Sequence, residues 1–173
     1  MKELYLKKLT EEDKDSWLEY MKEYSDVDKK VEKNFYDALD WHVEKEKLIS
    51  KLNIFYLMED SNLIGRIYIH LKPELLPKDK HDGSHISYSI IPSKRRQGYG
   101  SKMLHLGLEK CREFGLKEVI VSCLEENIAS AKVIENNYGI LFSVKPDIVQ
   151  KDKMLKTYKI DVEDSLNRYS QGV

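Results

Sequence analysis

Short segments in which apolar and polar residues alternate recur along the chain. This period of two is the pattern of β-strands that bury one face. Two neighbouring segments are separated only by the turn-forming sequence Asp60-Ser61-Asn62, so they predict a β-hairpin. The predicted strands are 4–9, 54–58, 63–71, 86–91, 119–124, 140–144 and 155–162.

In two segments of the N-terminal part, apolar residues recur three or four positions apart, which is the pattern of amphipathic helices. Thr10 precedes the first of these segments and is its predicted N-cap. The charged stretch 26–33 predicts a solvated turn between the two helices. Their apolar faces carry Trp17, Met21 and Tyr24 in the first helix, and Phe35, Leu39, Val43, Ile49 and Leu52 in the second.

Two further helices are predicted between the later strands. One spans 101–114 and is ended by Gly115, while Asn127 is the predicted N-cap of a helix that runs to Asn136 or Asn137. Residues 163–173 read as a loosely held tail. The order of elements therefore predicts a mixed α/β protein with a hairpin-rich sheet.

The stretch Arg95-Arg96-Gln97-Gly98-Tyr99-Gly100-Ser101 lies between a predicted strand and a predicted helix. Glycines allow close approach of the backbone, and the unpaired N–H groups of a helix start attract anions. A dinucleotide-binding loop would need a third small residue near Met103, and a Walker A loop would need Gly-Lys-Ser/Thr, where this chain has Gly100-Ser101-Lys102. The stretch predicts a different phosphate or pyrophosphate site, and a plain turn with solvated arginines is the alternative.

At two motifs the chain resembles the GCN5-related N-acetyltransferase (GNAT) superfamily. The first is the family's Gln/Arg-x-x-Gly-x-Gly/Ala loop, here Arg95, Gly98 and Gly100. The second is the later Asn-x-x-Ser segment, here Asn127 and Ser130. Together the two motifs resemble most closely those of bacterial members whose substrate is unassigned.

This resemblance implies a GNAT-like α/β fold, with a mixed, mostly antiparallel central sheet flanked by helices, in a single domain over 1–173. It implies a CoA-binding core at about 85–144, where two central strands splay apart and form the cleft for acetyl-CoA, the cosubstrate, with no metal. The amides from Gln97 to Ser101 would hold the pyrophosphate, with charge from Arg95 and Arg96. The implied cofactor-binding residues are Ser89, Ile90, Ile91, Arg95, Arg96, Gln97, Gly98, Tyr99, Gly100, Ser101, Asn127 and Ser130.

The implied reaction is direct attack of a primary amine on the thioester, which needs a base for the amine and a proton for the thiolate. His85 is the predicted base because many family members carry a Glu or His near this position; Glu74, Glu125 and water are alternatives. Many members carry an acidic Tyr seven residues after the motif Asn, where this chain has Ile134. Tyr138, one helical turn later, is the predicted acid. The departure at Ile134 motivates an alternative function, a non-catalytic acyl-CoA-binding regulatory module.

The composition of the chain limits the classes of partner that we expect. The chain has 173 residues, 41% of them hydrophobic, and its 29 Lys and Arg nearly balance its 30 Asp and Glu. We therefore expect neither nucleic acid nor a membrane as partner. Two cysteines and an N-terminus without an apolar leader favour the cytoplasm. The predicted acceptor is an amine of a small molecule or of a protein N-terminus; the mixed charges of 72–84, part of the implied acceptor pocket, name no substrate. The resemblance also implies a homodimer.

Overall fold

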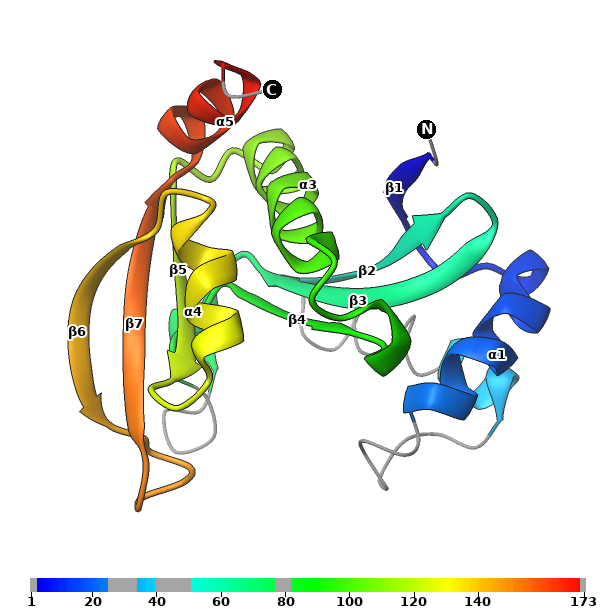
Figure 1. Cartoon of the computed structure of the whole chain (residues 1–173), viewed down its shortest axis with the longest axis horizontal. Coiled ribbons are helices and arrows are strands. Elements are labelled where there is room, and N and C mark those ends of the chain that lie inside the picture. The colour runs from blue at the N-terminus through cyan, green and yellow to red at the C-terminus, as the bar shows by residue number, and fades with distance from the viewer. Residues whose placement is uncertain (1–2, 25–33, 40–50, 77–81, 172–173) are drawn as a thin grey trace.

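Two antiparallel sheets, whose neighbouring edges are the strands β4 and β5, form the frame of the protein (Figure 1). The computed structural model describes residues 3–24, 34–39, 51–76 and 82–171. The first sheet has the order β1-β2-β3-β4 and the second the order β5-β7-β6. The strands are β1 (Leu4–Lys7), β2 (Leu52–Glu59), β3 (Asn62–His70), β4 (Ile86–Ile90), β5 (Glu118–Leu124), β6 (Ile140–Pro146) and β7 (Met154–Asp161).

The helices begin and end where the sequence supplies caps. Asn127 Oδ1 accepts the Ser130 N–H at 3.0 Å at the start of α4, and Gly115 follows α3 with a φ of 79°. Thr10 donates its N–H and its hydroxyl to the Asp13 carboxylate, at 2.8 and 2.9 Å, in the 3-10 turn before α1. The helices are α1 (Lys14–Tyr24), α3 (Tyr99–Glu113), α4 (Ile128–Glu135) and α5 (Val162–Gln171), and residues 35–39 are also helical.

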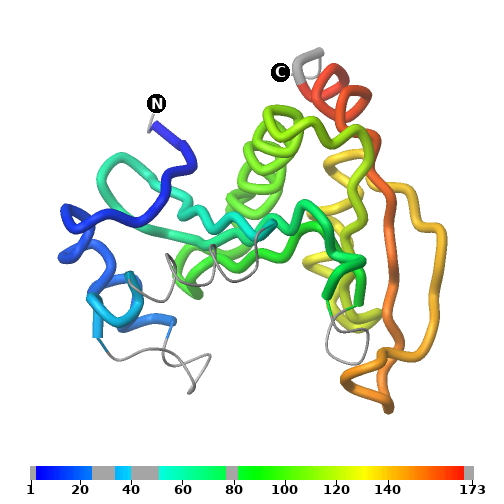
Figure 2. The backbone as a smooth tube through the Cα atoms, turned by 180° about the vertical axis from the view of Figure 1, so that it is seen from behind, coloured from blue at the N-terminus to red at the C-terminus, as the bar shows by residue number. Residues whose placement is uncertain are grey.

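The two faces of the first sheet differ in character. On one face α3 packs very closely: a Cβ on Gly65 would lie 3.1 Å from Met103 Sδ, and a Cβ on Gly107 would lie 2.5 Å from Ile67 Cδ1. Because side chains alternate along a strand, Arg66 and its even-numbered neighbours on β3 point to the opposite face. That face meets α1, which Figure 2 shows at the end of β2 and β3 farthest from the second sheet.

Several predicted boundaries need correction. Leu52 lies in β2, paired with His70, and not on a helix, because the β2–β3 ladder extends further than the alternation indicated. The first strand ends at Lys7, and α3 begins at Tyr99 instead of residue 101. The predicted turn at 26–33 and the helix positions Val43 and Ile49 lie outside the described residues. None of the described helices is long and apolar enough to cross a membrane.

The predicted loose tail at 163–173 is wrong over its described part, because residues 162–171 form helix α5. Its Ser165 is fully buried, and the hydroxyl donates to the Asn137 carbonyl at 2.9 Å. The Tyr169 ring stacks on the His105 ring of α3, with centroids 3.7 Å apart. These contacts join residues far apart in the sequence, and no local pattern predicted them.

Candidate active site

The basic loop between β4 and α3 is bent by residues in left-handed conformations. Pro92–Lys94 form a 3-10 turn, and Arg96 and Gly98 follow with φ values of 59° and 85°. Gly98 is the N-cap residue of α3. Glycine suits this position because a side chain is strained at such a φ.

The backbone N–H groups of this loop point to an anion site. The first helical hydrogen bond of α3 runs from the Lys102 N–H to the Gly98 carbonyl at 3.2 Å. Within the described part of the chain, no acceptor receives any N–H from Arg96 to Ser101. Unpaired amides at a helix N-terminus carry the positive end of the helix dipole, so this segment can cradle phosphate oxygens.

The buried carboxylate of Glu59 holds this loop in place. Glu59, at the end of β2, is 3% exposed, and it accepts hydrogen bonds from Lys94 Nζ and from the Tyr99 hydroxyl. On the other side, Ser93 donates its N–H and its hydroxyl to Glu23 of α1, at 2.9 and 2.8 Å. Lys94 therefore neutralises Glu59. No local sequence pattern marks Glu59, because its partners lie 35 or more residues away.

The two predicted arginines are placed differently. Arg95 Nε donates to the Ile90 carbonyl at 2.9 Å, which ties the loop to the end of β4. Arg96 is exposed beside the unpaired amides. Gln97 Nε2 donates to the Ser93 carbonyl at 2.8 Å and closes the loop on itself. The Arg95 side chain is thus tied to β4, whereas Arg96 is an exposed residue of the segment with unpaired amides.

The C-terminal end of α4 holds the N-terminal end of α3. The buried Asn137 donates Nδ2 to the carbonyls of Ser101 and Val133, at 3.1 and 2.9 Å. Asn136 Nδ2 donates to the Ser101 hydroxyl at 3.2 Å. A Cβ on Gly100 would already lie 3.0 Å from Val133, so α3 and α4 are in close contact there. Asn137 is a second residue that sequence reasoning missed, since an Asn near a helix end reads as a cap.

β4 and β5 separate beside this loop. They belong to different sheets, and two hydrogen bonds join His85, just before β4, to Ile120 of β5. The Ile91 N–H donates to the Ile64 carbonyl of β3 at 3.0 Å. In an antiparallel pair, successive residues face the partner strand alternately, so Ser89 also bonds toward β3. Of the three predicted backbone donors, Ile90 therefore directs its N–H away from β3, into the opening toward β5.

Hydroxyl groups from β4 and α4 meet across this opening. The Tyr88 hydroxyl lies 3.0 Å from Ser130 Oγ, in the first turn of α4. Burial raises the pKa of Tyr88, so its hydroxyl stays protonated at neutral pH. Burial likewise raises the pKa of the nearby Cys123 thiol on β5, which keeps it unreactive. Ser130 was predicted from its motif, whereas Tyr88 was not singled out.

The fold agrees with comparisons to known proteins. Residues 3–137 match the family model described as the acetyltransferase (GNAT) domain. The chain belongs to this family. No curated protein matches the chain.

Solved structures of GNAT proteins share the fold at low sequence identity. RimJ of Mycobacterium smegmatis, in complex with CoA-disulfide, is 13% identical with a TM-score of 0.73, over 98% of this chain and 88% of that chain. A GNAT-family acetyltransferase from Bacillus anthracis is 21% identical with a TM-score of 0.66, over 94% and 98%. A chimera of the Vibrio cholerae spermidine N-acetyltransferase SpeG with hSSAT is 17% identical with a TM-score of 0.66, over 95% and 99%.

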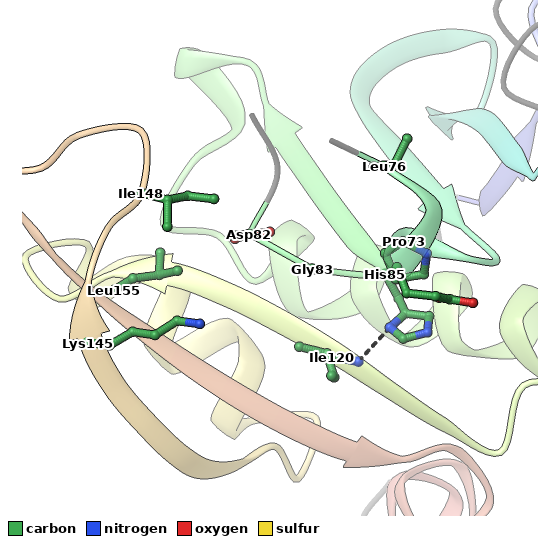
Figure 3. Close-up of a pocket in the computed structure, with 10 residues that line it drawn as sticks. Pro73, Leu76, Asp82, Gly83, His85, Ile120, Lys145, Ile148 and Leu155 are labelled. Atoms are coloured by element: carbon green, nitrogen blue, oxygen red, sulfur yellow. Dashed lines mark hydrogen bonds between the residues drawn. The ribbon is translucent and has the colours of Figure 1, made fainter. Parts of the chain in front are cut away.

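A pocket of about 460 Å³ lies beside His85 and Ile120, the residues that join the two sheets (Figure 3). It brings together the turn after β3, the N-terminal end of β4 and the β6–β7 region. Among the described residues, no three His, Cys, Asp or Glu side chains are grouped as metal ligands. The pocket is lined by Pro73, Glu74, Leu76, Asp82, Gly83, His85, Ile120, Lys145, Ile148 and Leu155.

His85, the predicted base, lines this pocket with one nitrogen engaged. Its Nδ1 accepts the Ile120 N–H at 3.1 Å, so the neutral ring carries its proton on Nε2 (Figure 3). His85 can therefore take up a proton only when the bond to Ile120 opens. Of the alternative bases, Glu74 lines the same pocket, whereas Glu125 is exposed and lies 3.9 Å from Lys156.

Tyr138, the predicted acid, lies apart from the hydroxyls that face the opening. It follows α4 with a φ of 61°, and the Arg168 guanidinium of α5 lies 5.4 Å from its ring centroid. Ile134, at the family's usual Tyr position, is fully buried. The fold thus brings Tyr88 and Ser130 together at the opening and holds Tyr138 against α5.

Proposed function

We propose that this protein transfers the acetyl group of acetyl-CoA to a primary amine, in a small molecule or at a protein N-terminus, by direct attack in a ternary complex. The observation that carries the proposal is the run of unpaired amides at residues 96–101 beside the open edge of β4. A pyrophosphate fits such a helix start, and the pantetheine arm can then continue along an unpaired strand edge. The CoA-disulfide in the structure of RimJ supports this assignment.

Acetyl-CoA, the acetyl donor, would be held by groups at both ends of the opening between β4 and β5. The amides from Arg96 to Ser101 bind the pyrophosphate, and the Arg96 guanidinium adds positive charge. Asn127 uses Oδ1 for the cap of α4, which leaves its Nδ2 to donate to the pantetheine arm. Glu59 acts as a positioning residue because it holds Lys94 and Tyr99.

The reaction would take place at the edge of β4. The Ile90 N–H donates to the thioester oxygen as negative charge develops there. The amine nitrogen attacks the carbonyl carbon, a C–N bond forms, and the C–S bond breaks. The amine passes one proton to the base, and the paired hydroxyls of Tyr88 and Ser130 stabilise the departing thiolate by a hydrogen bond until solvent protonates it. This pair replaces Tyr138 as the proposed group at the thiolate.

We propose that the attacking amine gives up its proton in the pocket lined by His85 and Glu74, at the end of the opening where β4 and β5 are hydrogen-bonded. His85 serves as the base if its bond to Ile120 opens during turnover, and Glu74 or water serves if it does not. His85→Ala and Glu74→Gln distinguish these routes through the pH dependence of kcat/KM. The base is the residue whose loss removes the acidic limb of the profile, and an unchanged limb in both variants assigns the step to water.

A thiol-release assay with acetyl-CoA and a broad panel of amines tests the function. Release that depends on an amine establishes the transferase. The alternative is a non-catalytic acyl-CoA-binding regulatory module, which the apolar Ile134 at the usual Tyr position favours. That alternative predicts tight binding of acetyl-CoA with no release in the presence of any amine.

Two glycine variants test the proposed loop by titration with acetyl-CoA. Gly98→Asp puts a negative charge at the pyrophosphate site, and we expect acetyl-CoA affinity to fall at least about tenfold. Gly115→Asp is the matched control, because Gly115 has a similar φ of 79° at the far end of α3. If both variants bind acetyl-CoA equally well, the loop assignment is wrong.

We further propose a cytoplasmic homodimer with no nucleic-acid partner. Cys111 and Cys123 are free, buried thiols, as expected in a reducing compartment. The net charge of −1 gives no basic surface field for nucleic acid. The dimer would form along β6, an edge strand whose Ile140, Phe142 and Val144 are exposed.

A further inference from the structure

A buried arginine stands beside the proposed reaction centre. Arg66 of β3 is only 9% exposed, and its guanidinium carbon lies 5.0 and 4.9 Å from the ring centroids of Tyr24 and Tyr68. Nη2 donates to the Tyr24 hydroxyl at 3.1 Å, while the buried Nε has no hydrogen-bond partner. Among the described residues, no carboxylate forms an ion pair with Arg66.

The surrounding tyrosines do not neutralise this charge. Tyr56 faces Arg66 across the β2–β3 ladder, and Tyr20 packs edge-on against Tyr56 at 5.8 Å. Burial raises the pKa of Tyr20, so its hydroxyl stays neutral and supplies a dipole instead of a counter-charge. A buried cation that lacks an anionic partner is costly for the fold. Such a group calls for an explanation, and a bound anion is the simplest one.

The position of Arg66 links it to the reaction. Arg66 is the register partner of Ser89, and the next residue, Ile90, carries the N–H that faces the opening. Directly paired residues in antiparallel strands have Cβ atoms about 5 Å apart, so the Arg66 side chain leaves β3 beside that of Ser89, on the same face of the sheet. The Arg66 side chain lies on the face of the sheet opposite α3, where Tyr24 of α1 packs against it.

We propose that Arg66 binds a carboxylate of the acceptor, so that the acceptor is an amine that carries a carboxylate near its reactive nitrogen. This inference rests on the proposed acetyltransferase function. Arginine pairs with carboxylates through parallel N–H bonds, and the orphaned Nε would gain an acceptor. Polyamines are poor acceptors in this arrangement, because their second ammonium group would lie against the buried guanidinium.

Matched acceptors test the inference on the unmodified protein. One arm compares free amino acids with the corresponding amino acid amides. The other arm compares peptide amides that begin with Glu or Asp with those that begin with Gln or Asn. In the arm that contains the true acceptor, we expect kcat/KM to be about 100-fold higher for the carboxylate form. Equal rates in both arms, or faster turnover of spermidine, overturn the inference.

Variants then assign the preference to this residue. Arg66→Gln is expected to bring the ratio of carboxylate to amide rates close to one, and Arg66→Lys to retain part of it. Arg168→Gln is the matched control, since Arg168 also lies over a tyrosine ring but belongs to α5. An acetyl-CoA-induced rise in melting temperature verifies that each variant is folded. A preserved preference in folded Arg66→Gln overturns the assignment.

Calorimetry separates failure of this inference from failure of the proposed function. If no amine releases CoA, the transferase proposal fails, and binding of an N-acetylated amino acid to the CoA-loaded protein is measured instead. Binding that requires both the carboxylate of the ligand and Arg66 supports the inferred carboxylate site. Equal binding of the N-acetylated amide removes it.

Discussion

At the scale of single residues, neighbours on β4 have different tasks. Ile91 gives its N–H to Ile64 of β3, whereas the Ile90 N–H faces the opening between the sheets. Ile90 also accepts Arg95 Nε at its carbonyl, so its peptide groups are held in place by the loop. A donor fixed before the reaction needs no reorganisation when charge develops on the thioester oxygen.

Replacing Ile90 by proline removes this N–H and leaves the β3–β4 ladder intact, because that N–H points away from β3. We expect Ile90→Pro to lower kcat about 100- to 1,000-fold relative to Ile90→Ala, with little change in KM for acetyl-CoA. Ile90→Ala controls for the loss of the buried side chain. Comparable kcat values in the two folded variants, measured by thiol release, would exclude the Ile90 N–H as the donor.

At the scale of elements, the geometry of the proposed site depends on how the helices begin and on how they pack against one another. The cap at Asn127 uses one atom of its amide, since Oδ1 accepts the Ser130 N–H. Helix α5 packs against α3 through Tyr169 and against the turn after α4 through Ser165, and Asn137 of that turn bonds to Ser101 of α3. In each case one set of contacts stabilises the fold and leaves the groups proposed to bind acetyl-CoA free to do so.

Two substitutions at Asn127 distinguish its roles. Asn127→Asp keeps the capping oxygen and loses the Nδ2 donor, whereas Asn127→Ala loses both. We expect only the alanine variant to lose stability, by about 1 kcal/mol. Both variants should bind acetyl-CoA about 3- to 10-fold more weakly, since one hydrogen bond is lost. Wild-type affinity in Asn127→Asp would mean that the residue is a cap alone, with thermal unfolding and titration as the readouts.

From the stack of His105 on Tyr169 we predict that the docking of α5 depends on pH. Burial lowers the pKa of His105 below its ordinary value of 6.5, an effect to which Arg112 adds and which Glu109 opposes. The folded state therefore favours the neutral ring. Its contribution to stability is present above pH 6.5 and is lost as pH falls through the lowered folded pKa.

We therefore expect the melting temperature to fall more between pH 7.5 and 5.5 in the wild type than in His105→Phe. Phenylalanine keeps an aromatic ring over Tyr169 and cannot take up a proton. Identical pH dependence in the two proteins would show that His105 does not control the docking of α5.

At the scale of the whole molecule, one apolar strand is uncovered. β6 lies at the edge of the second sheet, and Ile140 is 73% exposed. An exposed apolar edge can pair with the same strand of a second copy. We expect sedimentation to detect a dimer that Ile140→Lys dissociates and that Val149→Lys, outside β6, leaves intact. A monomeric wild type at micromolar concentration contradicts this interface.

Local patterns were sufficient to predict the central elements. The strand before residue 92, the glycine turn and the capped helices depend on residues within a few positions of one another. Local patterns failed at Leu52 and at residues 163–171, because a strand partner decides the first segment and contacts with α3 and the turn after α4 decide the second. Long-range pairing overrides local preference wherever a segment can bury apolar area against another element.

The sequence by itself determined the family, the loop at 95–101 and the cap at Asn127, since each depends on backbone conformations that nearby residues impose. Only the tertiary structure decided which N–H of β4 faces the opening, that Nδ1 of His85 is engaged, and that Tyr88 meets Ser130. It also decided that Arg66 is buried among tyrosines next to Ser89. These properties depend on strand register and on side chains from distant segments, which no local pattern encodes.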